Sequence, residues 1–141
     1  MQVKTTNSLE KELSSCSNLD FFLKENKTAF EDQSIVDVLQ FWIEKKGLTR
    51  KAVIENSGLN TVYGYQLLSG HRSPSRDKLL CLAFGLNMNT EEAQELLKKC
   101  GAARLYVKNR RDSMIMYGLE KGMTICQVNE KLYDEREETL F

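Results

Sequence analysis

The chain has 141 residues, of which 41% are hydrophobic and 28% are charged, which is the composition of an ordinary globular protein. This composition excludes a disordered or fibrous chain, and the length suffices for one core that needs neither a metal nor a disulfide. Twenty basic side chains balance twenty acidic ones, yet the middle of the chain is basic and both ends are acidic. A basic middle permits contact with phosphates without requiring it.

Residues 1–32 carry the weakest pattern of the chain. Asn18 is a suitable cap for a short helix with a cluster of apolar side chains, Leu19, Phe21, Phe22 and Leu23. Two adjacent aromatic side chains are too apolar for a free tail. We therefore expect an N-terminal extension whose short helix packs on the body of the chain, with a surface for a partner protein as the alternative.

Five helices are predicted in the central region, residues 33–101. Apolar side chains recur there at helical spacing, and cap residues and glycines mark the boundaries. The predicted helices begin and end near 35 and 46, 49 and 57, 60 and 69, 75 and 84, and 89 and 100.

The C-terminal region, residues 102–141, predicts two more helices, at about 109–121 and from Thr124 onward, followed by an acidic tail from Asp134 that frays outward. We expect this pair either to complete the core or to form the surface of a homodimer, and the pattern favours neither over the other. The candidate dimer surface consists of Met114, Met116, Tyr117, Met123 and Leu132. The chain is thus predicted to be all-α, with seven helices and a candidate eighth at the N-terminus.

The stretch 48–75 reads LTRKAVIENSGLNTVYGYQLLSGHRSPS. Glycine at a turn allows a positive φ, and a following apolar residue can bury itself between two crossed helices. Over about residues 33–86 the chain resembles the Cro and phage-repressor-like (XRE-type) family of helix-turn-helix regulators. The matching features are Thr49, Ser57-Gly58-Leu59, Asn60, Leu67, Gly70, Arg72, Pro74 and Ser75. The resemblance implies a lambda-repressor-like helix-turn-helix bundle, here with an N-terminal extension and two additional C-terminal helices.

In that family the second helix of the pair enters the major groove of DNA. Carried over by position, the residues that would face the bases are Thr61, Val62, Tyr65 and Gln66. The amide of Gln66 is the strongest candidate because it can pair in two places with adenine. Phosphate contacts would come from Arg50, His71, Arg72 and Ser75. The resemblance therefore implies a sequence-specific transcriptional regulator of the bacterial or phage type that binds double-stranded DNA as a homodimer.

Two positions depart from the family pattern. Ile54 stands where the family usually has a small residue, and Gly64 stands where it usually has a branched apolar one. The two exchanges can compensate each other if Ile54 fills the space over Gly64. Glycine lowers helix propensity by about 1 kcal/mol relative to alanine. We expect close helix packing, rather than the approach of a ligand, to explain its presence.

Several charged and polar residues admit a second interpretation. Gln66 can be a solvated side chain beside two half-buried tyrosines, and Arg72 and Arg76 can pair with Asp77 or with the Glu91-Glu92 cluster. A second basic cluster consists of Arg104, Lys108, Arg110 and Arg111. It either extends a phosphate-binding face or neutralises the acidic fifth helix or the acidic C-terminal tail.

The sequence holds no recognisable catalytic or metal-binding constellation, and we expect no enzyme, no metal and no cofactor. Four widely spaced cysteines are expected to be reduced and mostly buried. No signal peptide or membrane span is recognisable, so a cytoplasmic protein without membrane contact is predicted. The alternative to DNA binding is a protein-interaction module that keeps the helix-turn-helix corner as a scaffold and meets a partner through its N-terminal or C-terminal segment.

Overall fold

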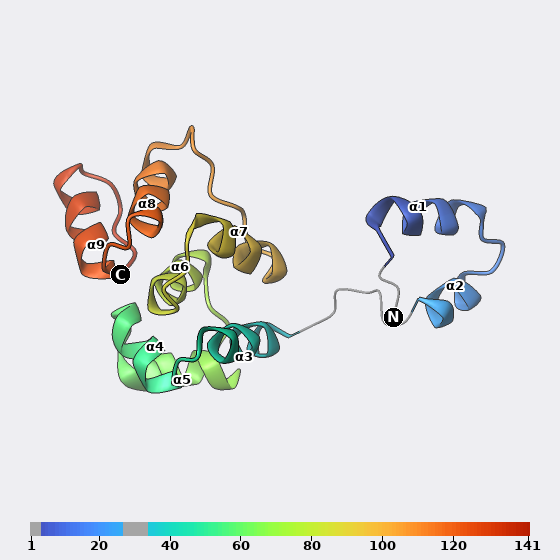
Figure 1. The fold of residues 1–141 in the computed structure, drawn as a ribbon, viewed down its shortest axis with the longest axis horizontal. Helices are drawn as coiled ribbons and strands as arrows, with labels where there is room; N and C mark the ends of the chain where they lie inside the picture. Colours follow the sequence, from blue (N-terminus) through green and yellow to red (C-terminus); the bar gives the residue numbers. More distant parts are fainter. Residues whose placement is uncertain (1–3, 27–33) are drawn as a thin grey trace. The chain divides into compact units, whose positions relative to one another are not determined.

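The computed structural model describes residues 4–26 and 34–141, and all regular structure in these two ranges is helical (Figure 1). This confirms the all-α prediction for the described residues. The chain divides into two compact units, Met1–Asp32 and Gln33–Phe141. Within the described ranges no helix is both long enough and apolar enough to cross a lipid bilayer.

The described part of the first unit contains α1 (Thr6–Ser15) and α2 (Leu19–Glu25). Asn18 caps α2 as predicted, because its side chain accepts a hydrogen bond from the backbone N–H of Phe21. The helix α1 is an addition to the predicted elements. Of the two adjacent aromatic side chains, Phe22 is buried and Phe21 is exposed. That this segment packs on the rest of the chain stays a prediction.

The second unit contains seven helices, one for each helix predicted in this part of the chain. Each is capped at its start by a serine, threonine or asparagine whose side chain accepts a backbone N–H of the first turn, which is why the starts could be predicted. The helices are α3 (Ile35–Lys46), α4 (Arg50–Ser57), α5 (Thr61–Ser69), α6 (Arg76–Gly85), α7 (Thr90–Lys99), α8 (Arg110–Glu120) and α9 (Ile125–Asp134).

Helix α6 forms the centre of this unit. Every residue from Leu79 to Gly85 is buried, so this stretch is covered on all sides rather than along one stripe. It packs against α4, α7 and α9 (Figure 1). Gly85 allows α4 to come close, because a methyl group added there would collide with the backbone carbonyl of Val53. The last two helices thus share a core with α4 and α5, as one of the two interpretations of residues 102–141 expected.

The segment after α9 returns to the corner between α4 and α5. Leu140 is buried in the core, and its backbone N–H donates to Oδ1 of Asn129 at 2.7 Å. The ring of Phe141 lies against Gly58, where an added methyl group would stand 2.6 Å from its Cε1 atom. The acidic tail, which the sequence predicts to fray outward, is therefore held against the second unit.

The expectation that the cysteines are mostly buried is wrong for Cys126, which is exposed on the first turn of α9. Only Cys81 is fully buried, and desolvation raises the pKa of its thiol to about 11. Cys100 is half-buried, and desolvation raises its pKa to about 11 as well. All four cysteines are free thiols.

The contact between Ile54 and Gly64 generates a test of the packing. Gly64→Ala would place a methyl group 2.7 Å from Cγ2 of Ile54, so we expect it to lower the free energy of unfolding by about 1–3 kcal/mol. Ile54→Ala alone should cost about 2–5 kcal/mol because it leaves a cavity. The double variant should lose clearly less than the sum of the two, since each change relieves the other. Urea denaturation measures all three, and additive losses would contradict the contact.

Candidate nucleic-acid interface

The corner between α4 and α5 has the local geometry that its sequence predicts. Thr49 caps α4, and Gly58 ends it in the left-handed conformation with a φ of 73°. Leu59 is buried in the turn, and Asn60 caps α5 by accepting the N–H of Tyr63 at 3.2 Å. The chain therefore leaves α4 and enters α5 through a tight, buried turn.

The contact of the two helices at Ile54 and Gly64 is the compensation that the sequence suggested. Three carbon atoms of the Ile54 side chain lie within 3.3 Å of the position that a methyl group at Gly64 would occupy. No alanine fits at position 64 without movement of Ile54. Gly64 is therefore a packing residue, which bears out the expectation of close helix packing over ligand approach.

The four candidate base-contacting residues lie on the outer side of α5. Its inner side is formed by Gly64, Leu67 and Leu68, which are buried. On the outer side Val62 is 67% exposed and Tyr65 is 41% exposed, while Thr61 is also exposed and Gln66 is partly so. The structure thus brings these four side chains to one accessible face.

Gln66 and Arg72 form one hydrogen-bonded unit. The Nε group of Arg72 donates to Oε1 of Gln66 at 2.7 Å, and the backbone N–H of Arg72 donates to the backbone carbonyl of Gln66 at 3.2 Å. The guanidinium also lies 5.9 Å from the ring centre of Tyr63, with Lys78 at the same distance from that ring. This arrangement holds the amide of Gln66 beside the guanidinium of Arg72. From the sequence, Gln66 was expected to contact a base and Arg72 a phosphate, without a link between them.

The remaining phosphate candidates have partners within the chain. Arg50 donates to the side chain of Gln40 at 3.2 Å. His71 and the hydroxyl of Ser69 are 2.8 Å apart. Ser75 caps α6 by accepting the N–H of Lys78. All three candidates are exposed, so these contacts orient their side chains without removing them from the surface.

Two of the four residues of the second basic cluster, Arg110 and Arg111, are paired with acidic side chains. Arg110 pairs with Glu135 at 2.6 Å and with Glu137 at 2.9 Å, which is the neutralisation by the C-terminal tail that one interpretation expected. The hydrogen bonds that Arg110 donates to the carboxylates of Glu137 and Glu135 raise the pKa of its guanidinium. Arg111 pairs with Asp77 at 3.0 Å. Arg104 and Lys108 are exposed and have no ion pair among the described residues.

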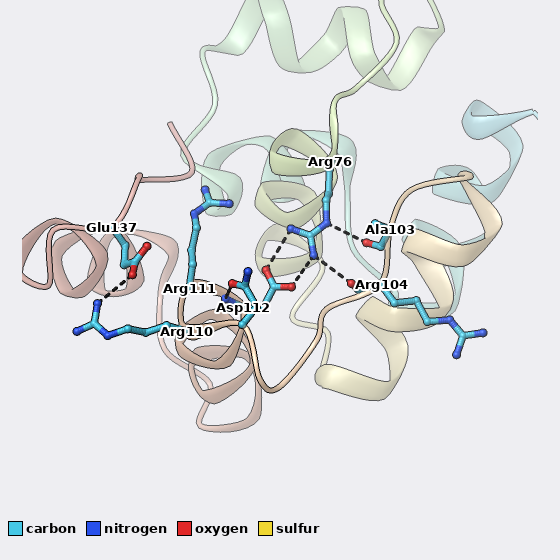
Figure 2. A pocket seen from close by; sticks show the side chains of 8 residues that line it. Arg76, Ala103, Arg104, Arg110, Arg111, Asp112 and Glu137 are labelled. Carbon is cyan, nitrogen blue, oxygen red and sulfur yellow. Dashed lines mark hydrogen bonds and ion pairs between the residues drawn. The ribbon is translucent and has the colours of Figure 1, made fainter.

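Arg76 has a partner that the sequence did not suggest. It pairs with Asp112 at 2.9 Å, rather than with Asp77 or the Glu91-Glu92 cluster, and Asp112 is only 6% exposed (Figure 2). Glu92 instead pairs with Lys46 at 2.8 Å. The pair of Arg76 and Asp112 joins the start of α6 to the start of α8. The sequence does not predict this ion pair, because the two residues lie far apart in the chain.

Comparisons with protein-family models, with curated protein sequences and with solved structures found no match to this chain. Among the described residues, no three histidine, cysteine, aspartate or glutamate side chains are grouped so that they could hold a metal ion.

Breaking the pair of Arg76 and Asp112 tests its structural role. Asp112→Asn leaves the Arg76 charge without its partner, so we expect the free energy of unfolding to fall by about 3 kcal/mol. Amide hydrogen exchange should also accelerate at Tyr106, whose N–H donates to Asp112. Glu137→Gln, which breaks an exposed pair, is the control and should have little effect on unfolding. Equal stability of the two variants would refute the assignment.

Proposed function

We propose that the protein is a sequence-specific DNA-binding transcriptional regulator and that α5 is its recognition helix. The observation that carries this proposal is the joined Gln66 and Arg72 pair on the accessible face of α5. A helix that reads bases needs a polar group able to bind a base edge and a cation able to bind the neighbouring phosphate. The lambda-repressor-like identity of the corner belongs to the same proposal and is supported by the caps of α4 and α5.

Each residue of this face has a defined chemical role in the proposal. The Nε2 group of Gln66 donates to N7 of adenine, and its Oε1 atom accepts from the adenine amino group while a second lone pair keeps Arg72. Val62 and Tyr65 offer apolar contact to a thymine methyl group, and Thr61 offers a hydroxyl. The phosphate contacts are Arg50, His71, Arg72 and the hydroxyl hydrogen of Ser75.

A binding measurement tests the DNA-binding proposal. DNA sequences that bind the purified protein are first selected from a random pool, and fluorescence anisotropy then measures affinity for the selected duplex and for a scrambled one between 50 and 200 mM salt. Gln66→Ala should cost about 1–3 kcal/mol on the selected duplex and little on the scrambled one. Arg72→Ala should weaken both and reduce the salt slope by about one.

Lys98→Ala is the matched control, since it removes an exposed cation from the end of α7. It should leave affinity and salt slope nearly unchanged. A protein that binds neither duplex at 50 mM salt would refute DNA binding. Equal losses from Gln66→Ala on both duplexes would reduce Gln66 to a positioning residue.

The proposal includes a homodimer, because dimers place two recognition helices one duplex turn apart. We assign the dimer contact to an apolar groove on α8 and α9 with a volume of about 360 Å³, lined by Ser113, Met114, Tyr117, Met123, Val128 and Lys131. The side chain of Tyr117 is 60% exposed there. Leu132, which the sequence placed on the same surface, is instead fully buried in the core.

Sedimentation velocity tests the dimer. The native protein should sediment as a dimer at micromolar concentration, and Tyr117→Glu should shift it to the monomer, since burying a carboxylate in an apolar contact opposes association. Tyr133→Glu changes another exposed tyrosine outside the groove and should leave the dimer intact. A native monomer at all concentrations would exclude this part of the proposal.

The second candidate function is a protein-interaction module, and the exposed Val62 and Tyr65 favour it. These two apolar side chains form an exposed patch on α5, and such a patch would also suit a groove on a partner protein. The salt series separates the two functions. Only DNA binding gives an affinity that falls steeply with salt, whereas contact through Val62 and Tyr65 would depend weakly on salt.

A further inference from the structure

The link between α7 and α8 is held in place by hydrogen bonds from the side chains of three helices. Residues 103–108 form no helix. Arg76 of α6 donates to the carbonyls of Ala103 at 2.9 Å and Arg104 at 3.1 Å. Figure 2 shows its guanidinium between these carbonyls and the carboxylate of Asp112. The first part of the link is therefore fixed to the start of α6.

Two further side chains hold the middle of the link. Gln94 of α7 accepts the N–H of Leu105 at 2.7 Å and donates to the carbonyl of the same residue at 2.8 Å. Asp112 of α8 accepts the N–H of Tyr106 at 2.9 Å. Within residues 103–108 only the side chain of Leu105 is buried. Because three helices hold the backbone of this segment, we call residues 103–108 the braced loop.

The braced loop directs large side chains outward. Tyr106 is 59% exposed and Val107 is 65% exposed, and the exposed cations Arg104 and Lys108 flank them in the sequence. In Figure 2 the guanidinium of Arg104 points away from that of Arg76. A loop that is ordered before binding loses little conformational entropy when a partner arrives. The outward side chains are therefore prepared for contact.

The braced loop lies at the end of the second unit opposite α5. In Figure 1 the link between α7 and α8 stands at one end of this unit, and α5 stands at the other. A molecule bound along α5 would therefore leave the loop accessible. The partner of the loop is then a second molecule, distinct from whatever α5 binds.

The charges of the braced loop favour an acidic partner. Arg104 and Lys108 have no ion pair among the described residues, whereas the acid that contacts the loop, Asp112, is paired with Arg76. The loop thus carries two positive charges that no carboxylate compensates. Tyrosine and arginine are the residue types that most often dominate the binding energy of protein interfaces. A protein segment with carboxylates on both sides of apolar side chains matches this surface.

Other anions match the braced loop less well. The hollow beside it, of about 510 Å³, is lined by Arg76, Arg110 and Arg111, and these guanidiniums already hold carboxylates. A small anion would therefore have to displace an acid of the chain. Proteins that bind nucleic acids commonly neutralise several phosphates, and the loop offers only two cations. Its exposed apolar area is instead suited to apolar side chains of a protein.

We propose that the braced loop is a docking surface for an acidic segment of a partner protein. Carboxylates of this segment pair with Arg104 and Lys108, and its apolar side chains pack on Tyr106 and Val107. The three side chains that bind the backbone of the loop position it and do not touch the partner. This inference goes beyond the proposed function and does not rest on it.

A peptide selection tests the chemistry of the partner. Phage-displayed random dodecapeptides are first depleted on the immobilised triple variant Arg104→Ala/Tyr106→Ala/Lys108→Ala and are then selected on the native protein at 50 mM salt. The depletion removes peptides that bind elsewhere. We expect the enriched peptides to share aspartate or glutamate on both sides of leucine, isoleucine or phenylalanine. A lack of enrichment, or enriched peptides without acidic residues, would overturn the inference.

Fluorescence anisotropy with an enriched peptide then measures the role of each side chain. Arg104→Ala/Lys108→Ala should weaken binding about tenfold at 50 mM salt and less at 500 mM, because salt screens exposed charges. Tyr106→Ala should weaken binding at both concentrations. The control Lys51→Ala/Lys121→Ala removes the same charge from exposed positions on α4 and at the far end of α8, and should bind as the native protein does. Equal affinities of the loop variant and the control would contradict the proposal.

Two further measurements complete the test. Thermal unfolding by circular dichroism should be the same for the native protein, the loop variants and the control, because the changed side chains are exposed. The loop variant Arg104→Ala/Lys108→Ala and the control should also not differ in affinity for a 30-base-pair duplex or for a single strand of 30 nucleotides. A loss of nucleic-acid affinity in the loop variant alone would assign the loop to a nucleic acid and overturn the inference.

Discussion

Ile54 fills the space that a side chain at position 64 would take, and the outward face of α5 depends on this contact. A larger residue at position 64 would push α5 away from α4 or turn it about its axis. Either movement would change which side chains of α5 are exposed. Successive side chains of an α-helix are about 100° apart around its axis, so a rotation of that size would expose a different set. The accessible set of Thr61, Val62, Tyr65 and Gln66 is therefore a consequence of how two buried surfaces fit.

The local features of the fold could be predicted from sequence because their causes are local. Caps such as Asn60 and left-handed glycines such as Gly58 act within one helical turn, so the boundaries of the helices in the second unit follow from neighbouring residues. The apolar spacing of each helix predicted an all-helical chain for the same reason. The face of α5 could also be predicted by position, whereas its joined Gln66 and Arg72 pair depends on how the loop after α5 turns back.

The partners of the arginines could not be predicted, because long-range pairing depends on the packing of helices. Asp112 stands three residues after the cap Asn109 and resembles an ordinary acid of a first helical turn, and Gln94 resembles a solvated side chain. Both bind the backbone of the link between α7 and α8 only when α6, α7 and α8 meet. The neutral total charge of the chain also did not indicate which cations have acidic partners. Carboxylates hold Arg76, Arg110 and Arg111, while Arg104 and Lys108 have no such partner in the described part of the chain.

The seating of Phe141 on Gly58 links the stiffness of the α4–α5 turn to a distant stretch of the chain. Gly58 has no side chain, and the aromatic ring of Phe141 occupies the space beside the turn that a side chain at Gly58 would take. The neighbouring Leu140 is anchored by Asn129 of α9 and by its burial in the core. A displacement of α9 would therefore move Leu140 and the ring of Phe141. Through this ring it would act on the turn between α4 and α5.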